Sequence, residues 1–243
     1  MKPKLHIYNN VELLIPALGE TFKQMVETAC DRGSLLHIAL PGGTTPKKFF
    51  EYLRGPISHD IYWQSLHFYW GDERCVPPDH AQSNYGMVAA ALLDHIDMPS
   101  THIHRIHGES QPEYEVLRYA AEINSTVPMN TLNLPQFDWI ILGLGTDGHI
   151  ASLFPSDKMV QSPDQICLIA THPDGRQKRI SITLPVINNA RRVSFLITGK
   201  AKAPVVASIL RNDPVSKQWP AVHVSPQSGL FEWYLDKAAA SLL

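Results

Sequence analysis

The chain has 243 residues, which is enough for one α/β domain with a large core, and we expect a single domain over residues 1–243. Hydrophobic residues are 44% and charged residues 18% of the chain, a composition that excludes disordered chains and coiled coils. The formal net charge of −2 predicts neither a nucleic-acid partner nor an anionic-membrane surface. No signal-like apolar run opens the chain, so we expect a cytoplasmic protein, with its oligomeric state left open.

Apolar residues recur at helical spacing from Val11 to Ala29, where Pro16 either bends the predicted helix or marks its true start. Short apolar runs then alternate with amphipathic segments. The predicted strands are 35–40, 66–74, 101–106, 137–145, 165–172, 179–185, 192–199 and 220–224. The further predicted helices are 47–53, one capped by Ser83 or Asn84, 113–124, 201–211 and 233–243. This alternation predicts a parallel sheet with helices on both faces.

Ligands of such sheets bind beyond the carboxyl ends of the strands, where three loops of this chain are rich in glycine or charge. The first, PGGTTP, places Gly42, Gly43 and Thr44 between a strand and a helix. Glycines at this position let backbone N–H groups approach an anion, which favours a phosphate site. The spacing is not that of a Walker A loop, and a purely structural turn is the alternative.

The second loop, GDER, places Asp72, Glu73 and Arg74 at a strand end. A guanidinium suits a phosphate or carboxylate, and a neighbouring carboxylate can orient it or handle protons. A surface ion pair is the alternative interpretation. Cys75 follows directly, but no partner histidine is evident from the spacing, so an inert thiol is favoured.

The third loop, GLGTDGH, matches the dinucleotide pattern G-x-G-x-x-G after a buried strand. Asp147 would bring a negative charge into the pyrophosphate turn, and Pro155 would interrupt the helix that must follow, so a nicotinamide site is disfavoured. His149 can instead move a proton near neutral pH, with Asp147 orienting its imidazole. A histidine that only packs in the turn is the alternative, and Ser152 lies in no G-x-S-x-G elbow.

Two further groups of side chains are candidates for sites. His102, His104 and His107 have no carboxylate or cysteine at a metal-site spacing, so structural histidines are favoured over a metal site. Arg179 opens a predicted strand, and Lys202 lies at a predicted helix start, where a cation is unfavourable unless an anion binds. Cys30, Cys75 and Cys167 are odd in number and far apart, which predicts reduced thiols.

Five segments occur in one order over nearly the whole chain: LPGGTTP, YWGDERCVPPDHAQSNYGM, ILGLGTDGHIASLFP, RISITLPVINNARRVSFLITGKAKA and GLFEWYLDKAAASL. In this order and wording the chain resembles the 6-phosphogluconolactonases of the glucosamine-6-phosphate isomerase/6-phosphogluconolactonase family. The resemblance implies a single-domain, modified Rossmann-type sheet similar to that of glucosamine-6-phosphate deaminase. It also implies hydrolysis of a phosphorylated sugar lactone, 6-phospho-D-glucono-1,5-lactone, in the pentose phosphate pathway without a metal or nucleotide cofactor.

The same resemblance implies roles for individual residues. His149 corresponds to the base that activates water, with Asp147 orienting it. The implied phosphate-binding residues are Gly42, Gly43, Thr44 and Lys202, assisted by Arg179. Arg74 would face the same anion or the developing carboxylate, and the implied pocket-shaping residues are Asp72 and Asn84.

Three alternatives remain beside this interpretation. The deaminases share the Asp-Glu pair and the D-G-H loop, but their N-E-P segment, whose glutamate serves a proton relay, is replaced here by Leu153, Phe154 and Pro155. A non-catalytic sugar-phosphate sensor is normally fused to a DNA-binding domain, for which we expect no room at the N-terminus. A dehydrogenase is the third alternative.

Overall fold

The structure is a computed structural model that describes residues 2–131, 133–155, 165–175, 177–227 and 229–243. Its helices are α1 (Val11–Asp31), α2 (Thr44–Leu53), α3 (Asn84–Ala91), α4 (Pro112–Thr126), α5 (Leu184–Asn189) and α6 (Ala203–Leu210). Its strands are β1 (Lys4–Tyr8), β2 (Leu36–Leu40), β3 (Leu66–Trp70), β4 (Asp72–Arg74), β5 (Ile103–His104), β6 (Trp139–Leu142), β7 (Cys167–Thr171), β8 (Lys178–Ile182), β9 (Arg192–Ile197) and β10 (Leu230–Asp236).

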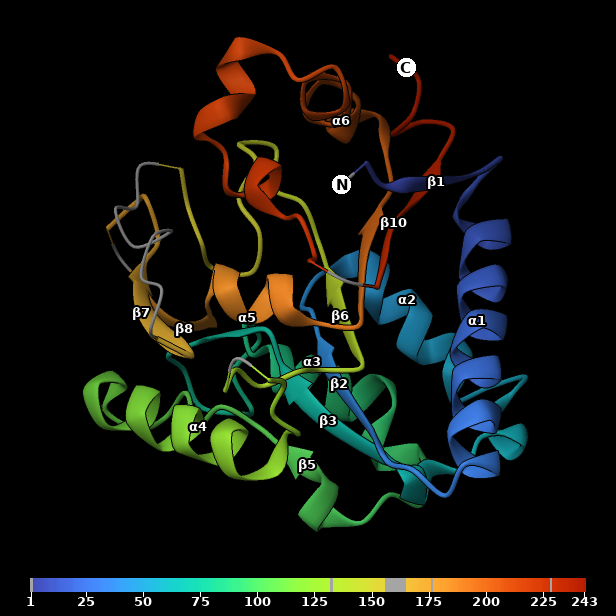
Figure 1. The fold of residues 1–243 in the computed structure, drawn as a ribbon, viewed down its shortest axis with the longest axis vertical. Helices are drawn as coiled ribbons and strands as arrows, with labels where there is room; N and C mark the ends of the chain where they lie inside the picture. The colour runs from blue at the N-terminus through green and yellow to red at the C-terminus, as the bar shows by residue number, and fades with distance from the viewer. Residues whose placement is uncertain (1, 132, 156–164, 176, 228) are drawn as a thin grey trace.

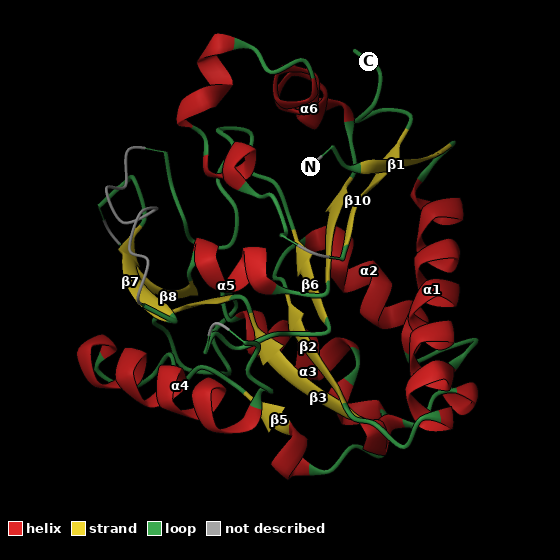
Figure 2. Ribbon diagram, viewed as in Figure 1, coloured by secondary structure: helices red, strands yellow, loops and turns green. Residues whose placement is uncertain are grey.

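The main sheet has seven strands in the order β1-β10-β9-β6-β2-β3-β5 (Figure 2). Every pair of neighbours in it runs parallel. Helices α1 and α2 lie on one side of this sheet, and α4 and α5 lie on the other (Figure 1). The predicted fold class, an α/β parallel sheet covered on both faces, is therefore confirmed.

The order of the strands fixes where a ligand can bind. From β2 the chain proceeds outward through β3 to β5, and it then returns to the other side of β2 to form β6. The connections therefore diverge between β2 and β6, which leaves a crevice outside the carboxyl ends of these two strands. The loops that begin at Pro41 and Gly143 border this crevice, and both belong to the glycine-rich loops identified in the sequence.

The core forms because the central strands are apolar on both faces. All residues of β2 and β6 are buried, as expected for parallel strands covered by helices on each side. Three tryptophans, Trp70, Trp139 and Trp233, are among the largest fully buried side chains and come from β3, β6 and β10. The positions of the strand ends, and so of the loops, rest on this packing.

Two predicted elements are wrong. Residues 233–243, predicted as a helix, belong to β10 up to Asp236, because the run from Phe231 to Asp236 is buried between β9 and β1. Its apolar spacing fits a helix as well as a strand, and the neighbouring strands decide between them. Residues 220–224, predicted as a strand, form a 3₁₀ turn over Pro220–His223.

The structure also contains a second, smaller sheet that was not predicted from the sequence. The segments 165–172 and 179–185 do contain strands, β7 and β8, but these pair antiparallel with each other, and β8 pairs antiparallel with β4. The GDER loop is therefore itself a strand of a small three-stranded sheet. The edge strand β1 was missed because it is short and largely exposed. Pro16 lies inside α1 and does not start it.

Candidate active site

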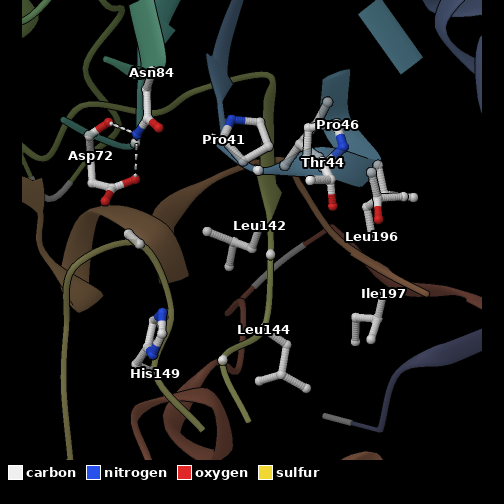
Figure 3. A pocket seen from close by; sticks show the side chains of 18 of the residues that line it. Pro41, Thr44, Pro46, Asp72, Asn84, Leu142, Leu144, His149, Leu196 and Ile197 are labelled. Carbon is white, nitrogen blue, oxygen red and sulfur yellow. Dashed lines mark hydrogen bonds between the residues drawn. The ribbon is translucent and has the colours of Figure 1, made fainter. Parts of the chain in front are cut away.

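A cavity of about 300 Å³, lined by polar and apolar side chains, lies in the crevice between β2 and β6. Nine of the ten residues to which the family resemblance gives roles line it: Gly42, Gly43, Thr44, Asp72, Arg74, Asn84, His149, Arg179 and Lys202. The tenth, Asp147, contacts His149 from outside the lining. In Figure 3, His149 and the Asp72–Asn84 pair lie on the left of this cavity, across from Thr44 and Pro46. The fold thus gathers segments that are more than 150 residues apart in the chain.

The loop between β2 and α2 forms one wall of the cavity. Gly43 is the N-cap of α2 and has φ +107°, a conformation that side chains with a Cβ rarely adopt. A Cβ on Gly42 would lie 1.9 Å from Oδ1 of Asn84, so only glycine fits there. The Thr45 hydroxyl lies 2.7 Å from that of Thr198, which ties the loop to the end of β9. The start of a ten-residue helix therefore faces the cavity, as an anion site requires.

The loop after β6 holds the histidine and its carboxylate partner. Nδ1 of His149 is 2.6 Å from Oδ1 of Asp147, and the His149 side chain is 30% exposed toward the cavity. Because the carboxylate accepts a hydrogen bond, it favours the tautomer with the proton on Nδ1. Among the described residues none hydrogen-bonds Nε2, so that nitrogen can accept a proton.

The glycines of this loop serve the His149–Asp147 pair. A Cβ on Gly145 would lie 2.1 Å from Nδ1 of His149 and 2.3 Å from Oδ1 of Asp147. Gly148 has φ +81°, and a Cβ there would lie 2.4 Å from the ring of Trp219. Two of the three glycines in the G-x-G-x-x-G match, Gly145 and Gly148, are thus explained by side chains packed against the turn, with no need for a pyrophosphate, whereas a Cβ on Gly143 would contact nothing within 4 Å.

The ionisation of Asp147 follows from the same contact. Burial acts to raise the pKa of Asp147, but the charge of His149 and the hydrogen bonds from its ring and backbone N–H lower the pKa by more, so it lies below its usual value. An ionised carboxylate at this position stabilises the imidazolium that forms when His149 takes a proton.

Two arginines stand side by side at the cavity. Arg74 of β4 and Arg179 of β8 are register partners in the small sheet. Arg74 donates from Nη1 to the carbonyl of Gln82, while the Nε atoms of both arginines are buried without a partner among the described residues. Burial lowers the pKa of Arg179, and the Arg74 charge adds to the lowering. Two adjacent guanidiniums with spare donors favour a bound anion.

Lys202 closes the cavity from the other side. It lies just before α6, and its Nζ donates to the carbonyl of Leu144 at 2.6 Å. Burial lowers the pKa of this ammonium, while Asp147 acts in the opposite direction. Lys202 therefore has hydrogen-bonding capacity left for an anion next to the loop that carries His149.

Glu73 is an exception among the charged residues of GDER, since it has no place at the cavity. Its buried carboxylate accepts from the hydroxyl of Ser83 and from the backbone N–H groups of Arg74, Asn84 and Tyr85. It thus caps the start of α3, and burial raises its pKa. The alternative of a surface ion pair is wrong for Asp72 and Glu73, because both side chains are buried.

The other sequence candidates lie away from the cavity. His102 and His104 pack in a group of stacked rings with His67, and the His107 backbone N–H donates to Glu115. Within the residues that the structure describes, no group of three or more His, Cys, Asp or Glu could hold a metal ion. Burial raises the pKa of Cys75 to about 11, as expected for an inert thiol.

Sequence reasoning missed Thr45 and Thr198 as lining residues. Thr198 follows β9 directly, so the rule that ligands bind at strand ends could have found it. It also missed the buried hydroxyl of Ser152, which contacts Asp72, because only the fold brings these two residues together.

The fold and the site define an α/β protein with an open parallel sheet. A cavity lined by cationic side chains lies at the strand ends, and a histidine–carboxylate pair lies at the edge of that cavity. The model of the family described as glucosamine-6-phosphate isomerases/6-phosphogluconolactonase matches residues 9–233. The chain belongs to this family. None of its helices within the described ranges is long and apolar enough to cross a membrane.

Individual relatives agree with the family match. The chain is 44% identical over 209 residues to 6-phosphogluconolactonase of Haemophilus influenzae, covering 86% of this chain and 88% of the relative. It superposes on the structure of 6-phosphogluconolactonase from Trypanosoma brucei with a TM-score of 0.87 at 27% identity, over 100% and 99% of the two chains. A monomeric glucosamine-6-phosphate deaminase matches with a TM-score of 0.82 at 21% identity over 99% and 100%, which speaks for the shared fold.

Proposed function

We propose that the chain is an enzyme that hydrolyses 6-phospho-D-glucono-1,5-lactone to 6-phospho-D-gluconate in the oxidative pentose phosphate pathway. The observation that carries the mechanism is the His149–Asp147 pair at the edge of the cavity. Nε2 of His149 has no hydrogen-bond partner among the described residues. The names of the curated relatives support the substrate.

The reaction needs one proton to move twice. A water molecule attacks the lactone carbonyl carbon while Nε2 of His149 takes a proton from that water. The tetrahedral adduct then breaks the bond between the carbonyl carbon and the ring oxygen, and the imidazolium returns the proton to that oxygen. The products are a carboxylic acid, which ionises, and a free hydroxyl. Asp147 holds the ring in the required tautomer and stabilises its charged form.

The remaining site residues fit an anionic substrate. The turn of Gly42, Gly43 and Thr44 and the ammonium of Lys202 would hold the phosphate, with Arg179 assisting. Arg74 would meet the same anion or the carboxylate that develops at the reacting carbon. Asp72 and Asn84 would shape the cavity wall from which these groups act.

The residues that follow loop 143–149, which we call the catalytic loop, support hydrolysis over deamination. Deamination coupled to isomerisation must open a sugar ring and move a proton between adjacent carbons, which asks for a further carboxylate. Leu153 and Phe154 occupy the corresponding part of the loop and are buried and apolar. Glu73, the other carboxylate shared with that family, is engaged in capping α3.

The test compares four measurements on the purified chain. We expect hydrolysis of 6-phosphogluconolactone well above the spontaneous rate and slower hydrolysis of gluconolactone without the phosphate. We also expect no ammonia from glucosamine 6-phosphate and no saturable binding of NAD or NADP. Ammonia release would move the assignment to the deaminase, and tight dinucleotide binding would contradict our interpretation of the loop. We further propose a cytoplasmic location and a small phosphorylated lactone as the partner, with no nucleic acid or membrane.

A further inference from the structure

A buried polar bridge, formed by Ser152, Asp72 and Asn84, joins the catalytic loop to the small sheet and to α3. The Ser152 side chain has no exposed surface, and its Oγ donates to Oδ2 of Asp72 at 2.6 Å. The side-chain amide of Asn84 donates to the backbone carbonyl of Asp72 at 2.8 Å and to its Oδ1 at 3.3 Å (Figure 3). Both oxygens of one buried carboxylate therefore accept hydrogen bonds from the protein itself.

These hydrogen bonds allow the Asp72 carboxylate to hold Ser152 in place. A hydrogen bond from a hydroxyl to an ionised carboxylate is charge-assisted and stronger than a neutral one. Loss of the donor would leave one oxygen of this buried carboxylate with one partner fewer, which costs free energy. The backbone N–H of Ser152 also donates to Oγ of Ser181 on β8, which is the register partner of Asp72. The bridge thus fixes Ser152 to both strands that carry the arginines.

The segment that contains Ser152 is a tight turn. Ile150 and Leu153 exchange backbone hydrogen bonds of 3.3 and 2.8 Å, so Ser152 lies within a closed loop of four residues. Ala151 has φ +46°, a conformation that an alanine adopts only where its surroundings impose it. His149 directly precedes this turn. Only Ile150 and Ala151 separate Ser152 from His149, and both belong to this turn.

We propose that Ser152 is a positioning residue for lactone hydrolysis. Its hydroxyl seats the turn of residues 150–153 on the Asp72 carboxylate, and this sets the distance between the His149 imidazole and the lactone held by the rest of the cavity. The inference rests on the proposed function, because it assigns to Ser152 a role in that reaction. A misplacement of about 1 Å can cost an enzyme on the order of 100-fold in rate.

Ser194 provides a matched control. It is also a buried serine, and its Oγ lies 3.4 Å from the buried carboxylate of Glu232, on strands β9 and β10. It does not line the cavity. Ser152→Ala and Ser194→Ala each remove a buried hydroxyl that contacts a carboxylate, so both should lower the midpoint of urea unfolding. Only Ser152→Ala should change catalysis.

We expect Ser152→Ala to lower kcat roughly ten- to 100-fold on both 6-phosphogluconolactone and gluconolactone, with KM for the phosphorylated lactone changed by less than about twofold. Ser194→Ala should keep the wild-type kcat. In a His149→Ala background, Ser152→Ala should cause no further loss, because Ser152 acts through His149.

Three outcomes would overturn the proposal: a wild-type kcat in folded Ser152→Ala, an equal loss in Ser194→Ala, or the full loss repeated in the His149→Ala background. If Ser152→Ala does not fold, Ser152→Cys keeps the approximate volume with a weaker donor. A several-fold lower kcat is then expected, and a wild-type kcat would contradict the role. Failure of the proposed function is separate, since it requires that the wild-type chain itself does not hydrolyse the lactone.

Discussion

The catalytic loop and the contact between β5 and α4 each contain a histidine whose Nδ1 lies at hydrogen-bond distance from a carboxylate, and His172 and Asp174 form a further such pair. In the catalytic loop, His149 lies 2.6 Å from Asp147, and on α4 the carboxylate of Glu122 lies 2.8 Å from His104 of β5. The two pairs differ in access, because the side chain of His149 is 30% exposed and that of His104 is 7% exposed. A histidine–carboxylate pair thus does not by itself identify an active site.

The two pairs also differ in the contacts of Nε2, the second ring nitrogen of the histidine. Nε2 of His104 lies 2.9 Å from Nδ1 of His67, and the His104 ring stacks on Tyr69 at 4.3 Å. His104 belongs to a histidine cluster whose rings stack side by side: His37, His67, His102 and His104. There the rings contribute packing and internal hydrogen bonds, whereas Nε2 of His149 has no hydrogen-bond partner among the residues that the structure describes.

Replacing His149 should give the largest effect of any change considered. We expect His149→Ala to fold normally and to lose about 10²- to 10⁴-fold in kcat for 6-phosphogluconolactone, the usual contribution of a general base. His104→Gln, the matched change in the other pair, should keep the wild-type kcat and lower the thermal midpoint. Steady-state kinetics and thermal denaturation distinguish these results. Near-native turnover in folded His149→Ala would remove the contrast between the two pairs.

The comparison also requires that the residues proposed to bind the phosphate, among them Lys202 and Gly43, lie in the same cavity as His149. Lys202→Ala removes one charged donor, which is typically worth about 1.5–3 kcal/mol, so KM for the phosphorylated lactone should rise roughly ten- to 100-fold. Gly43→Ala should act in the same direction, because φ +107° strains any side chain there. The kinetics of plain gluconolactone should change much less in both variants. An equal loss on both substrates would indicate damage to the fold and a misplaced phosphate site.

The histidine cluster should control stability at acid pH. Burial, followed by the neighbouring histidine charges, lowers the pKa of His37 and of His67 to about 4. Between pH 6.5 and about 4 the unfolded chain therefore binds protons that the folded chain does not, and stability falls as the pH falls through this window. Glu122, itself paired with Arg118, faces the cluster and retains a lowered pKa.

Thermal denaturation over this pH range tests the effect. We expect Tm to fall by roughly 5 °C from pH 7 to pH 5, the size that about 2 kcal/mol produces in a chain of this length, since solvent partly screens the incompletely buried His67. His149→Ala should retain the same slope, whereas His37→Phe should flatten it. If the fall of Tm with pH disappeared in His149→Ala, the acid sensitivity would arise from the catalytic loop and not from the histidine cluster.

The sequence predicted the glycine-rich loops and the central strands before them better than the C-terminal strand and the small sheet. The glycine-rich turns and the strands before them were identifiable because burial on both faces and tight turns leave strong local patterns, as in β2 and β6. The helix predicted at 233–243 was wrong because the apolar spacing of β10 does not reveal its neighbours. The pairing of Arg74 with Arg179 and the capping role of Glu73 depend on the small antiparallel sheet. No local pattern of apolar residues in the sequence predicts that sheet.

Removal of metal ions should have the smallest effect of all. The rings of His67 and His102 stack at 3.9 Å, so their in-plane lone pairs run side by side and do not converge on one point. Both nitrogens of His104 are engaged, one by Glu122 and one by His67. Hydrolysis through His149 uses a water and one imidazole, so prolonged incubation with a chelator should leave kcat and Tm unchanged. If zinc restored activity or raised the Tm of the chelated protein, the histidine cluster would have to be reinterpreted as a metal site, and the contrast between the two regions would no longer hold.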